Sequence, residues 1–241
     1  MVSESEYVDA GNPRLGGEGS GSGNDSGSGR GSSTAPVMAS VSMSLFVYSP
    51  RERLVVFDID GTITRADVRG YLESVYMDRY DFVHDGVADF MTHLTREHKN
   101  VHFIYVTSRP LEHLSHTRKL LSQNQGPPGP VFMNPESLAA ALVQEAVLKR
   151  SASMKTRYLA DIRAVFTASS RTSSPMDTPF VLGFGNRDSD DQAYRKGALL
   201  SGQGVYIVDT NSVLRGEGGA VYTDGYRCTR LRAQLASVLG S

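Results

Sequence analysis

Two aspartates separated by one residue follow a short apolar run near residue 55. Asp58 and Asp60 come directly after the run 54–57, Leu-Val-Val-Phe, which has the continuous apolar character of a buried strand in a parallel sheet. Side chains two residues apart on an extended chain project to the same side, so the two carboxylates face one space. Gly61 permits a sharp turn immediately afterwards. Open α/β sheets bind their ligands at the carboxyl ends of strands, where such a pair can serve as nucleophile, general acid or metal ligand.

The motif Asp-Ile-Asp-Gly-Thr at 58–62 resembles the nucleophile motif of the haloacid dehalogenase-like phosphatases. The alternative is a turn that merely contains Asp and Gly, a common combination. The apolar strand before the motif and the Thr-x-Thr pattern at 62–64 favour the phosphatase motif.

The elements that must position this motif alternate between strands and helices. Apolar runs predict further strands at 101–106, 131–133, 179–184 and 205–208, and a half-buried strand within 37–48. Helical spacing of apolar residues predicts helices near 67–75, 86–98, 111–122, 135–149, 155–165 and 228–239. This alternation predicts a Rossmann-like α/β fold, a parallel sheet with helices on both faces. The segment 64–107 leaves little room for a large cap domain.

Three of the predicted strands end in polar clusters, and parallel strands place their carboxyl ends along one edge. Phosphoryl transfer through an aspartyl intermediate needs a carboxylate nucleophile, an acid for the leaving oxygen, and positive charge on the phosphoryl group. We predict Asp58 as the nucleophile, Asp60 as the general acid and base, Thr107 as a donor to the phosphoryl oxygens, and Lys155 as the cation. The residues predicted to bind substrate are Thr62, Thr64, Ser108 and Arg109.

The same edge is predicted to bind Mg²⁺, which prefers oxygen ligands. The expected ligands are the carboxylates of Asp58 and Asp190, the main-chain carbonyl of Asp60, and Asn186. The superfamily often has Asp where Asn186 stands, so the amide offers an oxygen but one negative charge fewer. Asp188 and Asp191 compete with Asp190, because spacing alone barely separates them.

Each of the other assignments has an ordinary alternative. Thr107 can be a strand-end residue without a chemical role. Lys149 can replace Lys155, and isolated lysines are usually solvated. His113 and His116 lie one helical turn apart, but without further ligands nearby they are interpreted as surface histidines.

A more specific resemblance extends over about residues 44–239. Four segments are similar to the catalytic domain of the lipins. They are Asp-Ile-Asp-Gly-Thr-Ile-Thr at 58–64 followed by Asp67 and Gly70, Gly-Pro-Val-Phe-Met-Asn-Pro-Glu-Ser-Leu at 129–138, Phe-Gly-Asn-Arg at 184–187 with Asp190, and Ala-Tyr-Arg at 193–195. The C-terminal stretch 226–239 is similar to the lipin C-terminal helix. The resemblance implies a Mg²⁺-dependent phosphatidate phosphatase that releases diacylglycerol through an aspartyl-phosphate intermediate. It also implies a cytoplasmic protein in peripheral contact with the endoplasmic reticulum or nuclear membrane.

Two features depart from the lipin pattern. Nothing in the chain resembles the conserved N-terminal lipin region, so a separate region or partner chain is expected to supply it. The segment 76–85 also differs from lipins in length and residues.

Composition narrows the remaining possibilities. The 241 residues suit one substantial domain, expected at 37–241, after a Gly/Ser-rich flexible tail at 1–36. A net charge of -1 provides no global attraction to nucleic acid, and a single cysteine suits a reducing compartment. No apolar run approaches the length of a membrane span, and no secretory signal is evident.

Three functions are compatible with these observations. The first is the phosphatidate phosphatase. The second is a lipin-like module that binds phosphatidate without turnover; it is disfavoured because both aspartates are kept. The third is a phosphatase of the same superfamily that acts on a soluble phosphate ester or a phosphoprotein.

Overall fold

The computed structural model describes residues 43–65, 75–135, 144–169, 178–200 and 204–240. Contacts divide the chain into two units, Met1–Val47 and Tyr48–Ser241, and the sheet with its helices belongs to the second. The predicted tail 1–36 and most of the predicted helix 67–75 lie outside the described residues, and residues 75–76 are helical. In the described part of the chain, no helix is both long and apolar enough to cross a bilayer.

A seven-stranded sheet with the order β3-β2-β1-β4-β5-β6-β7 forms the centre of the described fold. Its first five strands in this order are parallel, and β6 and β7 extend it in antiparallel fashion. The bounds are β1 Arg53–Phe57, β2 Val101–Pro110, β3 Val131–Asn134, β4 Phe180–Gly185, β5 Val205–Val208, β6 Leu214–Arg215 and β7 Val221–Tyr222. The predicted Rossmann-like α/β sheet is therefore confirmed, with an antiparallel edge that apolar periodicity did not predict.

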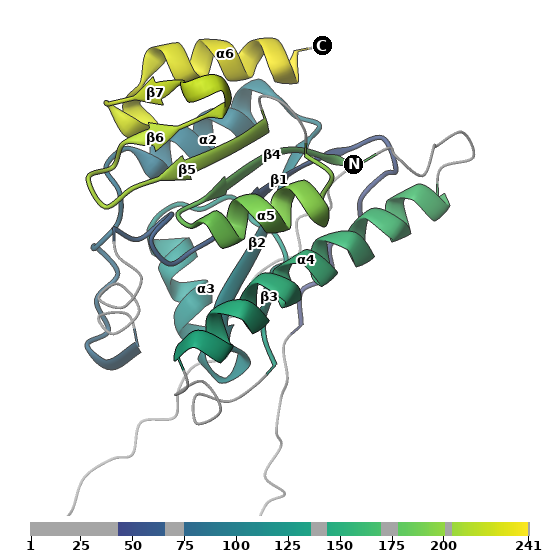
Figure 1. Ribbon diagram of the computed structural model, residues 1–241, viewed down its shortest axis with the longest axis vertical. Helices are drawn as coiled ribbons and strands as arrows, with labels where there is room; N and C mark the ends of the chain where they lie inside the picture. Colours follow the sequence, from purple (N-terminus) through teal and green to yellow (C-terminus); the bar gives the residue numbers. More distant parts are fainter. Residues whose placement is uncertain (1–42, 66–74, 136–143, 170–177, 201–203, 241) are drawn as a thin grey trace, which may run out of the picture. The chain divides into compact units, whose positions relative to one another are not determined.

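Helices cover both faces of this sheet, as predicted (Figure 1). On one face the buried side chains of α2 (Val87–Glu97), α3 (Leu114–Gln123) and α6 (Thr229–Leu239) join the larger hydrophobic cluster. On the other face α4 (Gln144–Ser169) and α5 (Asp188–Lys196) pack over β1, β2 and β4. Short 3-10 turns complete the chain at η1 (Leu111–His113), η4 (Glu217–Gly219) and η5 (Gly225–Arg227).

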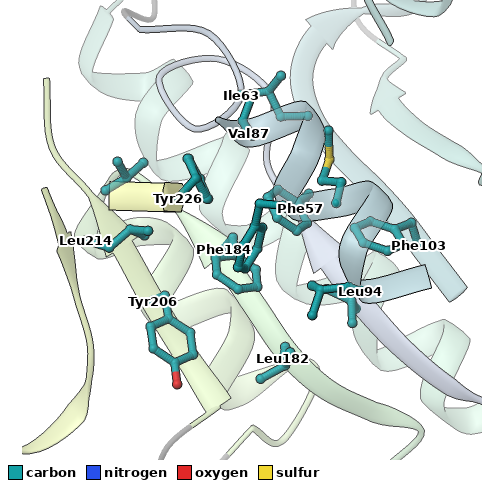
Figure 2. Close-up of a cluster of buried hydrophobic side chains, with 14 of the residues drawn as sticks. Phe57, Ile63, Val87, Leu94, Phe103, Leu182, Phe184, Tyr206, Leu214 and Tyr226 are labelled. Atoms are coloured by element: carbon teal, nitrogen blue, oxygen red, sulfur yellow. The ribbon is translucent and has the colours of Figure 1, made fainter. Parts of the chain in front are cut away.

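Aromatic side chains form the middle of the larger cluster. The Phe184 ring stacks on Phe57 with 4.5 Å between ring centroids and on Tyr206 with 5.2 Å, while Phe90 meets its edge at 5.3 Å. Figure 2 shows Phe57 and Phe184 side by side on neighbouring strands. Each ring is buried, so this aromatic layer packs beneath the carboxyl ends of β1 and β4, where the predicted site residues follow.

One long helix replaces two predicted ones. Helices are predicted at 135–149 and 155–165, with a break at 150–154. Residues 136–143 of the first lie outside the described residues, but α4 begins at Gln144 and continues through 150–154 to Ser169. That segment, Arg-Ser-Ala-Ser-Met, contains neither glycine nor proline, so nothing in it ends a helix.

The predicted half-buried strand within 37–48 is not found where the structure describes it. Residues 43–47 have no regular secondary structure, and Met43, Leu45 and Val47 are about four-fifths exposed. Alternating apolar residues describe a strand only when a partner strand and a core lie beside them. Residues 37–42 lie outside the described ranges.

The topology places the predicted site at a junction in the sheet. From β1 the chain builds outward through β2 and β3, then returns to place β4 on the other side of β1. Ligands of open α/β sheets bind beyond the carboxyl ends of the strands at such a switch point. Asp58 follows β1 and Asn186 follows β4, so the two stand on either side of it.

Phe184→Ala is expected to lower the free energy of unfolding by about 3–5 kcal/mol, because it removes a fully buried ring that contacts three others. Urea denaturation of both proteins measures the change. Val165→Ala is the control, since Val165 is 65% exposed, and it should stay within about 0.5 kcal/mol. A loss for Phe184→Ala no larger than the control's would contradict the role of the aromatic layer.

Candidate active site

The loop after β1 is closed by its own main chain. The Ile59 carbonyl accepts hydrogen bonds from the amides of residues 62–64, at 3.3, 2.9 and 3.1 Å. Gly61 stands in the left-handed region with φ 83°, which glycine adopts at little cost, and its amide donates to the Thr64 hydroxyl at 3.0 Å. The Asp58 amide remains tied to the sheet by its bond to the Phe184 carbonyl, at 2.9 Å. The nucleophile candidate is therefore fixed to both the sheet and the turn.

A buried lysine joins two buried carboxylates beside this loop. Lys155 Nζ donates to Asp58 Oδ1 at 2.6 Å and to Asp190 Oδ1 at 2.7 Å. All three residues are at most 4% exposed. The second oxygen of Asp58 accepts a hydrogen bond from the Thr62 hydroxyl at 3.0 Å. The structure thus brings Asp58, Lys155 and Asp190 together in one buried ion-pair network.

The single positive charge of this network does not neutralise its two carboxylates. Burial raises the pKa of Asp58 to about 7; Lys155 opposes that rise, and Asp190 adds to it. Burial also works against the charged form of Lys155, but Asp190 and Asp58 outweigh it and raise the pKa of Lys155 above its ordinary value. One ammonium therefore stays charged between two carboxylates and compensates them incompletely.

Asp190 also organises the turn between β4 and α5. Its Oδ2 accepts the main-chain amides of Asn186 and Arg187, each at 3.1 Å. Gly185 leaves space for it, because a Cβ there would lie 2.4 Å from the Asp190 Cβ. Asp190 is therefore buried and bonded at this turn, whereas Asp188 is exposed. The side chain of Asn186 is half-buried at the same turn, and its predicted role as a metal ligand stays a prediction.

Two of the competing candidates, Asp191 and His116, have other partners. Asp191 pairs with Arg195 one turn along α5, at 3.0 Å, and the side chain of Lys149 lies outside the described residues. His116 Nδ1 meets the Tyr80 hydroxyl at 3.2 Å, and its ring lies 6.3 Å from that of His113. His116 thus contacts the neighbouring loop through Tyr80, and the interpretation of both histidines as residues outside a metal site stays a prediction.

Asp60 belongs to a second cluster, built on β2. The Arg109 guanidinium donates through Nε to both oxygens of Asp60, at 3.1 and 2.9 Å, and through Nη2 to Oδ1 at 2.7 Å. The Thr107 hydroxyl donates to Asp60 Oδ2 at 3.2 Å and accepts the Arg109 amide at 3.2 Å. The proposed general acid is therefore held from the end of β2.

The predicted substrate-binding residues are arranged differently from expectation. A hydroxyl has one proton to donate, and those of Thr62 and Thr107 go to Asp58 and Asp60. The Thr64 hydroxyl closes the turn, and the Arg109 side chain is 1% exposed against Asp60. Ser108 is exposed at the end of β2. The hydroxyls of Thr62, Thr64 and Thr107 and the Arg109 guanidinium thus contact the protein itself in this structure.

Two residues outside the predicted set, His84 and Tyr226, contact main-chain carbonyls of the loop after β1. His84 lies within hydrogen-bond distance of the Gly61 carbonyl through Nε2 at 3.2 Å and of the Ser212 hydroxyl through Nδ1 at 2.7 Å. Because a carbonyl only accepts, Nε2 carries the proton and Nδ1 accepts from Ser212. The Tyr226 hydroxyl donates to the Thr62 carbonyl at 2.9 Å. No motif spacing in the sequence indicates these contacts, which join residues 23 and 164 positions apart.

Metal binding at this edge would need more than side-chain carboxylates. Among the residues that the structure describes, no group of three or more His, Cys, Asp or Glu side chains is arranged to hold a metal ion. The predicted ligand set is of another kind, since it combines two carboxylates with an amide and a main-chain carbonyl. It stays a prediction.

Lys155→Met is expected to lower the free energy of unfolding by about 3–5 kcal/mol, because it keeps the bulk of the side chain but leaves two buried carboxylates uncompensated. Urea denaturation at neutral pH measures the loss. Lys119→Met breaks the exposed pair with Asp78 and should cost only a fraction of that. Equal losses would show that the buried bridge does not hold the site together.

His84→Gln is expected to change the acid side of the stability profile. Burial lowers the pKa of His84, so below its ordinary value of 6.5 the unfolded chain binds a proton that the folded protein resists. This contribution of His84 to the free energy of unfolding decreases as the pH drops from 6.5 toward 5. Over that range the stability of the variant relative to the wild type should therefore increase. Urea denaturation across pH 5–8 tests this, with the half-buried His93→Gln as control. Identical slopes for His84→Gln and wild type would contradict the expectation.

The chain is similar in sequence to several proteins named as phosphatidate phosphatases. The chain is 34% identical over 180 residues to phosphatidic acid phosphohydrolase 1 of Saccharomyces cerevisiae, covering 71% of this chain and 20% of that protein. It is 31% identical to phosphatidate phosphatase PAH1 of Arabidopsis thaliana and 28% identical to phosphatidate phosphatase LPIN1 of Homo sapiens, covering 65% and 64% of this chain and 17% and 16% of those proteins. The chain thus spans about a sixth to a fifth of the length of these relatives.

The model of the family LNS2 (Lipin/Ned1/Smp2) matches residues 31–236, which include the whole site. That family is part of the haloacid dehalogenase-like superfamily, in agreement with the sheet and the aspartate loop. The chain therefore belongs to the LNS2 (Lipin/Ned1/Smp2) family.

Proposed function

We propose that this protein is a Mg²⁺-dependent phosphatidate phosphatase that works through an aspartyl-phosphate intermediate. The observation that carries the proposal is the buried bridge from Lys155 to Asp58 and Asp190, at 2.6 and 2.7 Å, at the carboxyl edge of the sheet. A nucleophilic carboxylate needs a nearby cation to receive a phosphate dianion, and Lys155 supports that role.

In the first step an oxygen of Asp58 attacks phosphorus and the bond from phosphorus to the glycerol oxygen breaks. Asp60 in its protonated form gives a proton to the departing oxygen, so diacylglycerol leaves as a neutral alcohol. In the second step Asp60 takes a proton from water as the water oxygen attacks the phosphoryl group. The bond to Asp58 breaks, phosphate leaves, and both aspartates return to their first state.

The residues present fit a divalent cation. Lys155 alone does not compensate two buried carboxylates, and the raised pKa of Asp58 reflects its burial together with the remaining negative charge. Oxygen donors from Asp58, Asp190 and Asn186 and the carbonyl of Asp60 match the preference of Mg²⁺. When bound, Mg²⁺ supplies positive charge that favours the transferring phosphoryl group. Lys155 holds the nucleophile in place and shares the neutralising role.

Phosphatidate is proposed as the substrate because three relatives bear the names of enzymes that act on it. Peripheral contact with the endoplasmic reticulum or nuclear membrane is part of the same proposal. So is the contribution of an N-terminal lipin-like region, since the chain covers only about a sixth to a fifth of each relative. The retained pair Asp58 and Asp60, each with its own buried cationic partner, favours turnover over binding alone.

Asp58→Asn is expected to reduce Mg²⁺-dependent phosphate release from phosphatidate in mixed micelles by about 1,000-fold or more, because a neutral amide cannot form the aspartyl phosphate. Chelation of Mg²⁺ should abolish the wild-type rate as well. Asp161→Asn, on the exposed Asp161–Arg157 pair of α4, is the control and should retain the wild-type rate.

Two other outcomes would contradict the proposal. Liposome binding without turnover in the wild type would indicate a phosphatidate-binding module. Soluble phosphate esters hydrolysed as fast as phosphatidate would indicate a soluble-ester phosphatase that uses the same residues.

A further inference from the structure

We infer that Arg109 is a positioning residue that fixes the carboxylate of Asp60, and that it does not bind the substrate. The inference rests on the phosphatase function proposed above. It assigns a task to an arginine whose side chain is almost completely buried at the site edge, although its place in the sequence predicts a substrate-binding role.

The contact has the geometry of a fork. Arg109 donates through Nε and Nη2 to the two oxygens of Asp60 at 2.7 to 3.1 Å. Two parallel bonds from a planar guanidinium fix both the position and the plane of a carboxylate, which a single bond from lysine does not. The Arg109 side chain is 1% exposed and that of Asp60 is 18% exposed. The part of this pair that is accessible from outside is therefore the carboxylate of Asp60, and the guanidinium of Arg109 lies behind it.

The fork stands on a rigid element. Arg109 and Thr107 lie two residues apart on β2, so both side chains project from the same side of the strand. Thr107 donates to Asp60 and accepts the main-chain amide of Arg109. The general acid itself lies on the loop that turns at Gly61. A carboxylate on a loop is thus held by two residues of a neighbouring strand.

The consequence concerns the leaving group. A general acid acts only when it lies within hydrogen-bond reach of the departing oxygen. Loss of the fork should therefore impair protonation of that oxygen and leave binding of the phosphate unchanged. Substrates with poor leaving groups depend most on this protonation, and those with good leaving groups depend least.

The experiment compares Arg109→Gln and Arg109→Lys with the wild type on short-chain phosphatidate and on p-nitrophenyl phosphate. Arg109→Gln is expected to lower kcat/KM about 100-fold on the alkyl ester and less than about tenfold on the aryl ester, with KM nearly unchanged. Arg109→Lys should have a kcat/KM between those of the wild type and Arg109→Gln. A third variant, Arg109→Ala, should be partly restored by added guanidinium.

Arg195→Gln is the matched control. Arg195 donates through Nε to both oxygens of Asp191, at 3.0 Å each, so it forms a similar pair on α5 outside the site. This variant should keep the wild-type ratio of the two substrates.

A stability cycle tests the contact without relying on activity. Arg109→Gln should shift the unfolding equilibrium about tenfold more in the wild-type background than in Asp60→Asn. Additive effects would overturn the inference, as would a raised KM with unchanged kcat or equal losses on both esters. A wild type without phosphate release would refute the proposed function, while the cycle would still decide whether Arg109 holds Asp60.

Discussion

The bridge from Lys155 to two buried carboxylates is the interaction on which the site depends. Burying three charges costs several kcal/mol per ion unless their partners are held in place. Lys155 comes from α4, Asp58 follows β1, and Asp190 lies on α5. Tyr194 ties α5 to β4 through its hydroxyl bond to the Phe184 carbonyl, at 2.7 Å, and that same carbonyl accepts the amide of Asp58. The packing of these helices on the sheet is therefore also what makes the charges compatible with burial.

Much of the fold could be predicted because buried parallel strands are continuous apolar runs. The runs at 54–57, 101–106 and 205–208 stand out for that reason, and each forms a strand. Elements of two residues, such as β6 and β7, leave no such pattern. The predicted strand within 37–48 shows the opposite error, since alternation in 43–47 occurs without a strand. The predicted break before Lys155 is wrong because a short polar segment does not end a helix that lacks glycine and proline.

For the site, the sequence motifs predicted the residues near Asp58, but the contacts between residues far apart in the sequence could not be predicted. Asp58 and Asp60 could be predicted from the strand before them and their spacing. Lys155 could not be separated from Lys149 in the sequence, because isolated lysines are usually solvated. Only the packing of α4 brings Lys155 to Asp58, 97 residues away. The direction of Arg109 depends on how β2 lies beside the β1 loop, which the sequence does not reveal. Motifs thus identified the residues at the edge, and the fold decided what each of them contacts.

The most direct test of the central claim is chemical identification of the covalent intermediate. Acid quenching during turnover of phosphatidate, followed by borohydride reduction, converts an aspartyl phosphate to homoserine, which mass spectrometry locates in the peptide. We expect the modification at Asp58, dependent on Mg²⁺ and absent from Asp58→Asn. Modification at another residue, or none during confirmed turnover, would contradict the assignment of Asp58 as the nucleophile held by Lys155.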